Sequence, residues 1–286
     1  MTEKIKVELT GISETMLWPL HYRVEYARKN PSFLDDPIAL ELVDTIDYDF
    51  SGKFGTGHVG HAIRARYGDD LIRAFHDREG DRTVVVALGE GLETQAWRIN
   101  RPAIRWITVD LPEAIKVRRD LLPTEKNHRL IGCSALEPDW LDEISSDDKV
   151  FISATGLFMY FEPGQVQSLL RKIATRAPTA ELYFDCIPPG FSSRAMKGMQ
   201  VTRQYKAPKM PWGISIDHIP NFLAQSGWDT IAAITYAQPY PEYMKFYSIL
   251  SRIGPIRRAL APGLVHATVL GSKTHLSEMW GKHQRY

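Results

Sequence analysis

The sequence of 286 residues predicts an α/β protein built on a mostly parallel β-sheet with helices on both faces. After about residue 80, short β-branched runs alternate with amphipathic stretches, which is typical of right-handed strand–helix–strand units. Before that point, apolar residues recur at helical spacing. We therefore expect an N-terminal helical cap at 1–80 and an α/β core at 81–286.

The expected elements follow from the local patterns. Helices are predicted in the cap over 15–30, 37–46 and 60–78. In the core, strands are predicted at 83–89, 103–110, 149–156, 181–187, 230–237 and 266–273, and helices at 92–100, 111–122, 162–177 and 217–228. The segment at about 192–214 is rich in Met, Lys and Pro and has no clear period, so we expect a lid insertion there.

Composition excludes several classes of partner. The net charge is +1, which gives no electrostatic reason to expect nucleic acid or a membrane surface. The N-terminus shows no signal-peptide pattern, and no apolar run reaches the ~18 residues of a membrane span. Cys133 and Cys186 are far apart and match no metal-binding spacing. We therefore expect a cytoplasmic protein without metal, nucleic-acid or membrane partners.

The stretch TVVVALGEGLETQAWRI turns from a buried strand into a helix on two glycines, Gly89 and Gly91. Such a turn lets a ligand approach bare backbone at a helix N-terminus. A dinucleotide-binding motif requires a third glycine at the position where this sequence has Thr94. Glu90 and Glu93 would moreover repel a diphosphate, so the turn disfavours a nicotinamide dehydrogenase and favours a cationic or neutral ligand.

An acid follows at the tip of the second predicted strand. Asp110 stands nineteen residues after Gly91, where a carboxylate can accept both ribose hydroxyls of an adenosine. The turn and Asp110 together favour a nucleoside that has no phosphates and carries a positive charge, and S-adenosylmethionine fits this description. The alternative is that the glycines only form a tight turn and Asp110 caps the next helix.

Four stretches occur in order along the chain: VVVALGEGLETQAWRI, VDLPEAIKVRRDLL, CSALEPDW and FISATGLFMYFEPGQVQSLL. Together they resemble the leucine carboxyl methyltransferase family, and most closely its bacterial branch of tetracenomycin-type polyketide O-methyltransferases. The resemblance runs from about Thr15 to Ile187. It implies a Rossmann-like class I methyltransferase with a seven-stranded sheet and with S-adenosylmethionine as the methyl donor.

The resemblance also assigns donor-binding roles to residues of this sequence. Arg64 matches the arginine that holds the donor's carboxylate, which a guanidinium grips with two parallel hydrogen bonds. The alternative for Arg64 is a solvated helix face. Gly89, Gly91 and Glu93 match the donor loop, and Asp110 matches the ribose acid.

Two further matches depart from the usual pattern. Ser134 and Ala135 match the strand end beside adenine, where many relatives have Asp-Leu. Thr155 stands where relatives commonly carry a glutamate that faces the donor's amino group. The missing charge leaves a second interpretation open, a methyltransferase-fold protein that binds S-adenosylmethionine but catalyses a different reaction or only binds ligand.

Transfer to a phenol would benefit from a base, whereas an ionised carboxylate needs none. His218 follows the lid segment, and Tyr160 follows the strand predicted at 149–156. These two are the candidate catalytic residues. His21, His58 and His61 are further candidate bases. Tyr160 could instead belong to the core.

The acceptor site is expected beside the lid, with Tyr22, Tyr160, Arg203 and Trp212 as candidate substrate-binding residues. The lid carries five basic residues, namely Arg194, Lys197, Arg203, Lys206 and Lys209. They favour an acceptor with a carboxylate or an ionised phenol, unless the lid is a solvated loop. We expect an O-methyltransferase acting on such a group of a small polyketide-like or other secondary-metabolite molecule. Exposed Met and Trp side chains nearby could instead form a homodimer contact.

Overall fold

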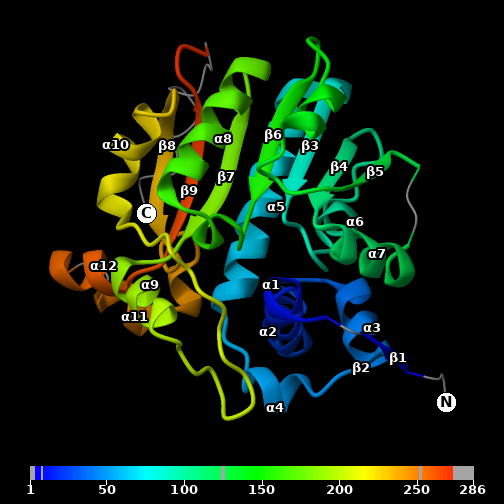
Figure 1. Ribbon diagram of the computed structural model, residues 1–286, viewed down its shortest axis with the longest axis vertical. Coiled ribbons are helices and arrows are strands. Elements are labelled where there is room, and N and C mark those ends of the chain that lie inside the picture. The colour runs from blue at the N-terminus through cyan, green and yellow to red at the C-terminus, as the bar shows by residue number, and fades with distance from the viewer. Residues whose placement is uncertain (1–3, 8, 124–125, 251–252, 273–286) are drawn as a thin grey trace.

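The computed structural model describes residues 4–7, 9–123, 126–250 and 253–272. Within these ranges, a seven-stranded sheet forms the centre of the molecule and helices cover both of its faces (Figure 1). The last part of the predicted core, 273–286, lies outside the described residues.

The sheet is mostly parallel, with one antiparallel strand near its edge. In space the strands follow the order β5-β4-β3-β6-β7-β9-β8, and β9 runs antiparallel to both of its neighbours. The strands are β3 (Thr83–Leu88), β4 (Arg105–Asp110), β5 (His128–Gly132), β6 (Lys149–Ala154), β7 (Glu181–Cys186), β8 (Trp228–Thr235) and β9 (Gly263–Val269). The predicted fold class, with seven strands in a mostly parallel sheet, is confirmed.

Two hydrophobic cores lie on opposite faces of the sheet, because successive side chains of a strand point to opposite sides. On β3, Val84 and Val86 belong to the core that also contains Leu170. Val85 of the same strand belongs to the other core, which includes Phe75. The covering helices are α5 (Gly60–Glu79), α6 (Gln95–Ile99), α7 (Pro112–Leu121), α8 (Pro163–Arg176) and α10 (Ile219–Ala224). Helix α9 (Pro189–Met196) follows β7 and packs in a separate cluster with Met159 and Ile187.

The N-terminal helices lie beside the carboxyl ends of the central strands (Figure 1). They are α1 (Gly11–Glu14), α2 (Leu17–Lys29), α3 (Pro37–Thr45) and α4 (Phe50–Phe54), with a short parallel pair of β1 (Ile5–Lys6) and β2 (Ile46–Asp47). Helix α3 begins where its sequence predicts, because the Asp36 carboxylate accepts a hydrogen bond from the Ala39 N–H and Pro37 occupies the first turn.

The segment predicted as an irregular lid is partly helical. Helix α9 extends to Met196, so residues 192–196 form its last turns, and only the remainder has no regular structure. That remainder reaches the N-terminal helices (Figure 1). The Thr202 hydroxyl bonds to the Lys53 carbonyl oxygen at 2.7 Å, and the buried Tyr205 ring packs on Trp18 and Phe54. The segment is therefore anchored on the cap instead of lying free in solvent.

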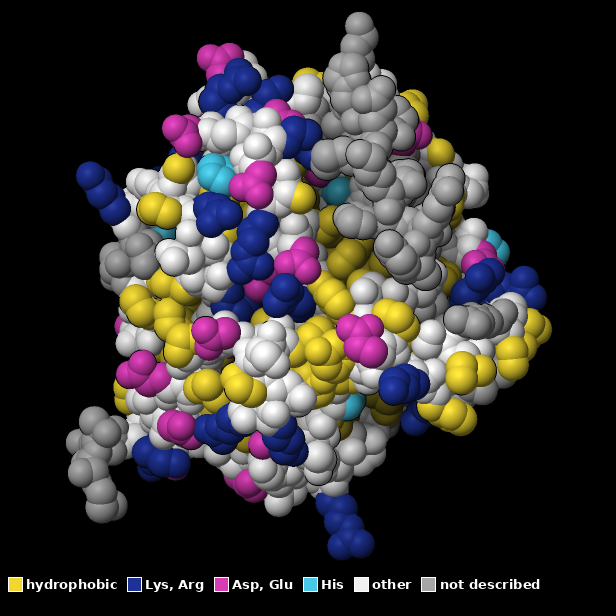
Figure 2. Space-filling model, turned by 180° about the vertical axis from the view of Figure 1, so that it is seen from behind, with side chains coloured by type: hydrophobic (Ala, Val, Ile, Leu, Met, Phe, Trp, Pro, Cys, Tyr) yellow, Lys and Arg dark blue, Asp and Glu magenta, His cyan; other side chains and the backbone are white. Residues whose placement is uncertain are grey.

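Exposed apolar side chains gather at the projecting edge formed by α9, α11 (Lys245–Leu250) and α12 (Gly254–Leu260), as Figure 2 shows. They are Met196, Phe246, Ile249 and Ile253. The expectation of a homodimer remains a prediction. Among the described residues, no helix is long and apolar enough to cross a membrane, and no group of three or more His, Cys, Asp or Glu is placed to hold a metal ion.

Candidate active site

A cavity of about 290 Å³ lies between the carboxyl ends of the central strands and the N-terminal helices. Gly89 follows β3, Asp110 ends β4, Thr155 follows β6 and Asp185 lies near the end of β7, and all four line it. Arg64 reaches the same cavity from α5. Ligands of parallel α/β sheets bind at this edge, so the fold gathers distant polar residues where a ligand would sit.

The predicted site residues divide into two groups. The residues that line the cavity are Arg64, Gly89, Gly91, Glu93, Asp110, Thr155 and Tyr160. The residues that lie outside its lining are Tyr22, Ser134, Ala135, Arg203, Trp212 and His218. The first group comes mostly from the donor-binding prediction, and the second mostly from the acceptor prediction.

The residues of the second group have other surroundings. His218 is exposed on a short 3₁₀ turn, and Arg203 is exposed on the lid segment. Trp212 is buried against Phe184 and Phe222, which places it in the core. The Tyr22 hydroxyl donates to the Phe54 carbonyl oxygen at 2.8 Å and so supports the cap.

On the strand expected beside adenine, Ser134 accepts a hydrogen bond from the Leu136 N–H within its own turn. Ala135 packs in the core on the α8 side of the sheet. Neither residue is placed by the structure against the cavity, so an adenine role for them remains a prediction.

The loop after β3, predicted to bind the donor and called the donor loop below, needs glycine at two positions. Gly89 and Gly91 have φ values of +61° and +53°, a region that other residues rarely adopt. A Cβ atom on Gly89 would lie 2.7 Å from Leu157 Cδ1, and one on Gly91 would lie 2.7 Å from Met16 Cβ. Both positions therefore leave room only for backbone, and the loop presents that backbone to the cavity.

The two acids of the loop are already neutralised by arginines. Glu90 forms an ion pair with Arg118 at 3.1 Å and accepts a hydrogen bond from Trp106 Nε1 at 3.2 Å. Glu93 forms ion pairs with Arg23 and Arg98. The expectation that these carboxylates repel a diphosphate assumed free acids, whereas both are paired within the protein, and Glu93 shares its two arginines with Asp36 and Asp69.

Arg23 and Arg98 belong to a buried charge network that joins the cap to the core. Arg23 of α2 and Arg98 of α6 both bond to Asp36, the first residue before α3, and Arg98 also bonds to Asp69 of α5. Burial alone would raise the pKa of Asp36, but the two guanidiniums lower it to about 2. The network fixes the cap against the donor loop, since Arg23 also donates to the Leu92 carbonyl oxygen.

Asp110 lies at the rim of this loop. Its carboxylate accepts hydrogen bonds from the Gly91 N–H at 2.7 Å and the Leu111 N–H at 2.8 Å. Burial raises the pKa of the carboxyl, and the two backbone donors oppose that effect. Each oxygen accepts one backbone bond, so each keeps a lone pair for a hydroxyl of a ligand.

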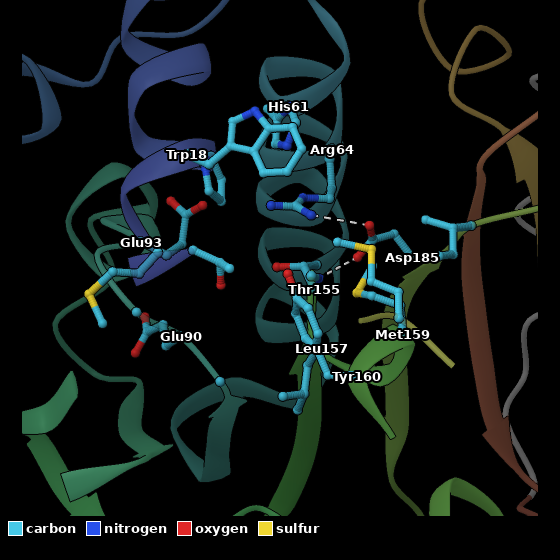
Figure 3. A pocket seen from close by; sticks show the side chains of 18 of the residues that line it. Trp18, His61, Arg64, Glu90, Glu93, Thr155, Leu157, Met159, Tyr160 and Asp185 are labelled. Atoms are coloured by element: carbon cyan, nitrogen blue, oxygen red, sulfur yellow. Dashed lines mark hydrogen bonds and ion pairs between the residues drawn. The ribbon is translucent and has the colours of Figure 1, made fainter. Parts of the chain in front are cut away.

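At the other end of the cavity the lining is mainly apolar. Trp18, Met159, Phe191 and Met210 contribute to it. In Figure 3 Met159 lies beside the Asp185 side chain and Trp18 lies near Arg64, with the Glu93 carboxylate next to Trp18 and Glu90 farther away. A molecule bound at this end would contact a large hydrophobic surface beside the polar centre of the cavity.

Two histidines provide polar atoms in this apolar part. Burial lowers the pKa of His58, and burial together with the charges of Arg64, His58 and Arg23 lowers the pKa of His61 well below its usual range. Both rings are therefore neutral at pH 7. His58 Nδ1 accepts the Gly60 N–H at 3.1 Å, which places the proton of His58 on Nε2. His61 Nδ1 has no hydrogen-bond partner among the described residues.

Comparison with known proteins identifies the family. The leucine carboxyl methyltransferase family matches residues 21–174 of this chain. The tetracenomycin polyketide synthesis O-methyltransferase TcmP of Streptomyces glaucescens is 32% identical over 244 residues, which cover 82% of this chain and 89% of that protein. The chain belongs to the leucine carboxyl methyltransferase family. It is an S-adenosylmethionine-dependent methyltransferase.

One further relative and one solved structure resemble the chain, the structure in its fold. The S-adenosyl-L-methionine-dependent methyltransferase dpfgK of Gibberella zeae is 29% identical to this methyltransferase over 190 residues, or 60% of this chain and 63% of that protein. The crystal structure of a candidate methyltransferase from Thermobifida fusca shares the fold, with a TM-score of 0.52, 15% identity and coverage of 87% of this chain and 94% of that chain.

The cavity of the methyltransferase fits the S-adenosyl group chemically. The loop presents bare backbone at Gly89 and Gly91, which both line the cavity, and Asp110 keeps lone pairs for ribose hydroxyls. Arg64 uses one of its five N–H donors on Asp185 in the described contacts, which leaves others for a carboxylate. We therefore expect these four residues to hold the donor.

The methyltransferase should lose stability in acid through a histidine behind the donor loop. His128 Nε2 lies 2.7 Å from Thr108 Oγ1, and burial followed by the charge of Arg118 lowers the pKa of His128 to about 3. The unfolded chain binds a proton here below pH ~6.5, whereas the folded protein does so only near pH 3. Stability therefore falls as the pH falls through this window, by at most ~1.4 kcal/mol per pH unit.

The variant His128→Gln should remove this contribution. Urea unfolding measured between pH 7 and pH 4 should show a shallower loss of unfolding free energy for the variant than for the wild type. Equal slopes would mean that His128 takes up its proton equally well in the folded protein.

Proposed function

We propose that this methyltransferase transfers the methyl group to a phenolic hydroxyl of an apolar, polyketide-like small molecule. The observation that carries the proposal is the composition of the cavity lining, to which the apolar side chains of Trp18, Met159 and Phe191 and two neutral histidines all contribute. A flat aromatic acceptor buries apolar surface there and still finds a partner for its hydroxyl. The relative named for tetracenomycin polyketide synthesis supports the same class of acceptor.

A carboxylate acceptor has less support. Of the two guanidiniums that line the cavity, that of Arg23 is paired with acids and that of Arg64 is expected to hold the donor's own carboxylate. Of the lid segment, only Met210 reaches the lining among the described residues, and Phe191 joins it from α9. The basic residues that favoured an anionic acceptor therefore stand elsewhere on the lid.

His61 has the position expected of the group that receives the hydroxyl proton. It lies one turn before Arg64 on α5, so both side chains point from the same helix face into the cavity (Figure 3). The donor supplies an electrophilic methyl group, and the enzyme contributes alignment of the acceptor oxygen with it. In this proposal a nitrogen of the neutral His61 ring accepts the hydrogen bond of the phenol, and a lone pair of the phenol oxygen is directed at the methyl group.

Tyr160 lines the same region and gives the acceptor a second polar neighbour. Burial raises the pKa of Tyr160, although the Thr15 hydroxyl beside it opposes that shift. The Tyr160 hydroxyl therefore stays protonated at neutral pH. It acts as an orienting group in this proposal, and not as a base.

The test is a transfer assay with labelled S-adenosylmethionine and two matched polycyclic acceptors, one with only phenolic hydroxyls and one with only a carboxyl group. We expect a labelled aryl ether from the first and little ester from the second. His61→Ala should lower kcat by about 10²- to 10⁴-fold on the phenol, whereas the exposed His218→Ala should not. Accumulation of the methyl ester, or an equal loss in both variants, would contradict the proposal.

A further inference from the structure

Asp185 is a buried acid at the centre of the cavity to which the sequence patterns gave no role. Asp185 is only 3% exposed, yet it lines the cavity. Oδ2 lies 3.1 Å from Arg64 Nη1 and accepts the Tyr236 hydroxyl at 2.8 Å. Oδ1 accepts the Gly156 N–H at 2.5 Å. Since a carboxylate oxygen can accept two bonds, Oδ1 retains one lone pair.

The other acids that line the cavity are held by partners on its far side. Glu90 pairs with Arg118, and Glu93 pairs with Arg23 and Arg98. Asp110 is bound by two backbone N–H groups at the end of β4. Among the described cavity-lining carboxylates, Asp185 is therefore the one that lies beside Arg64 (Figure 3).

The pair formed by Arg64 and Asp185 is complementary to an amino-acid group. The donor ends in a carbon that carries both a carboxylate and an ammonium group. A guanidinium beside a carboxylate offers each of these charges an opposite charge at neighbouring points of one surface. Thr155, next to Gly156, provides no charge for the ammonium group.

We infer that Asp185 binds the α-ammonium group of S-adenosylmethionine, and that this contact takes the place of the acid missing at Thr155. The Tyr236 hydroxyl and the Gly156 N–H hold the carboxylate, so the ammonium group adds one donor to a fixed acceptor. The inference concerns the donor and is independent of the acceptor proposed above.

Calorimetry with two ligands separates this contact from a structural role. S-adenosylhomocysteine carries both amino-acid charges, whereas its desamino analogue keeps only the carboxylate. We expect the wild type to prefer S-adenosylhomocysteine by about 10- to 100-fold, the range for a hydrogen bond between charged groups. Asp185→Asn should abolish most of that preference by weakening S-adenosylhomocysteine and leaving the analogue within a few-fold.

Two further variants complete the test. Tyr236→Phe removes a group that holds Asp185 but keeps the acid, so it should retain the preference. Thr155→Glu, added to Asp185→Asn, should restore the preference because it returns a carboxylate to the same side of the cavity. Circular dichroism and thermal unfolding establish that each variant is folded.

Equal weakening of both ligands by Asp185→Asn would overturn the inference, since it would mean that Asp185 only orients Arg64. If Asp185→Asn does not fold, the affinities of the wild type for the two ligands test the inference. Equal affinity for S-adenosylhomocysteine and its desamino analogue would also overturn it. Failure of the wild type to bind either ligand would instead count against the donor site as a whole.

Discussion

Replacing Arg98 with methionine should lower the free energy of unfolding by about 3–5 kcal/mol, the cost of leaving buried charges without their partner. The Arg98 side chain is 3% exposed and pairs with three carboxylates, those of Asp36, Asp69 and Glu93. Arg23 alone would remain to balance them, and it has no described contact with Asp69. The loss should also loosen the cap from the donor loop, because the three acids come from both parts.

Urea unfolding of Arg98→Met measures this effect, and Arg101→Met is the matched control. Arg101 is exposed, and its Nη2 lies 3.7 Å from Oδ1 of the exposed Asp77. Its replacement should therefore lower the free energy of unfolding by less than ~1 kcal/mol. A similar small cost for both variants would show that the network contributes no more than a surface ion pair.

Asp110→Ala should weaken the binding of S-adenosylhomocysteine by about 1.5–3 kcal/mol, or about 10- to 150-fold in the dissociation constant. The carboxylate keeps two lone pairs after its bonds to Gly91 and Leu111, and two ribose hydroxyls would use them. Asp110→Asn retains one acceptor oxygen and should fall between the wild type and alanine.

Calorimetry on the folded variants provides the measurement. Asp120→Ala, on the exposed face of α7, is the control that should leave binding unchanged. If Asp110→Ala binds as tightly as the wild type, Asp110 serves only to hold the backbone of the loop and of the first turn of α7.

The fold could be predicted because its signals are local. The β-branched runs at Thr83–Leu88 and Lys149–Ala154 are completely or almost completely buried, and such runs differ clearly from amphipathic helices. Strand β5 gave no comparable pattern, since its residues His128–Gly132 begin with His and Arg, end with Gly, and none of them is fully buried. It was expected only through the seven strands that the family resemblance implies.

That Gly89, Gly91 and Asp110 meet at one cavity could also be predicted from sequence, because they lie at the ends of strands that meet at one edge of the sheet. The ion pairs around these residues could not be predicted from sequence. Glu90 is balanced by Arg118 and Glu93 by Arg23 and Arg98, and these partners come from other helices. Long-range pairs of this kind have no signature in the local pattern.

The acceptor side could not be predicted for a related reason. Trp212 sits in a Pro- and Gly-rich stretch that indicates a loop, yet packing against Phe222 buries it. The residue type alone does not tell which histidine reaches the cavity. His61 does so because α5 runs past the cavity, whereas His218 does not line it. Asp185 lies within a run of buried residues that indicates nothing more than a core strand.

The central claim is that one cavity, between the N-terminal helices and the strand ends, holds the S-adenosyl donor beside an apolar acceptor site. A crystal structure of the protein with S-adenosylhomocysteine tests it most directly. The account predicts ribose hydroxyls within hydrogen-bonding distance of Asp110, the amino-acid group at Arg64 and Asp185, and the sulfur directed toward Trp18 and His61. A ligand bound elsewhere, or bound here with its ribose away from Asp110, would contradict the account.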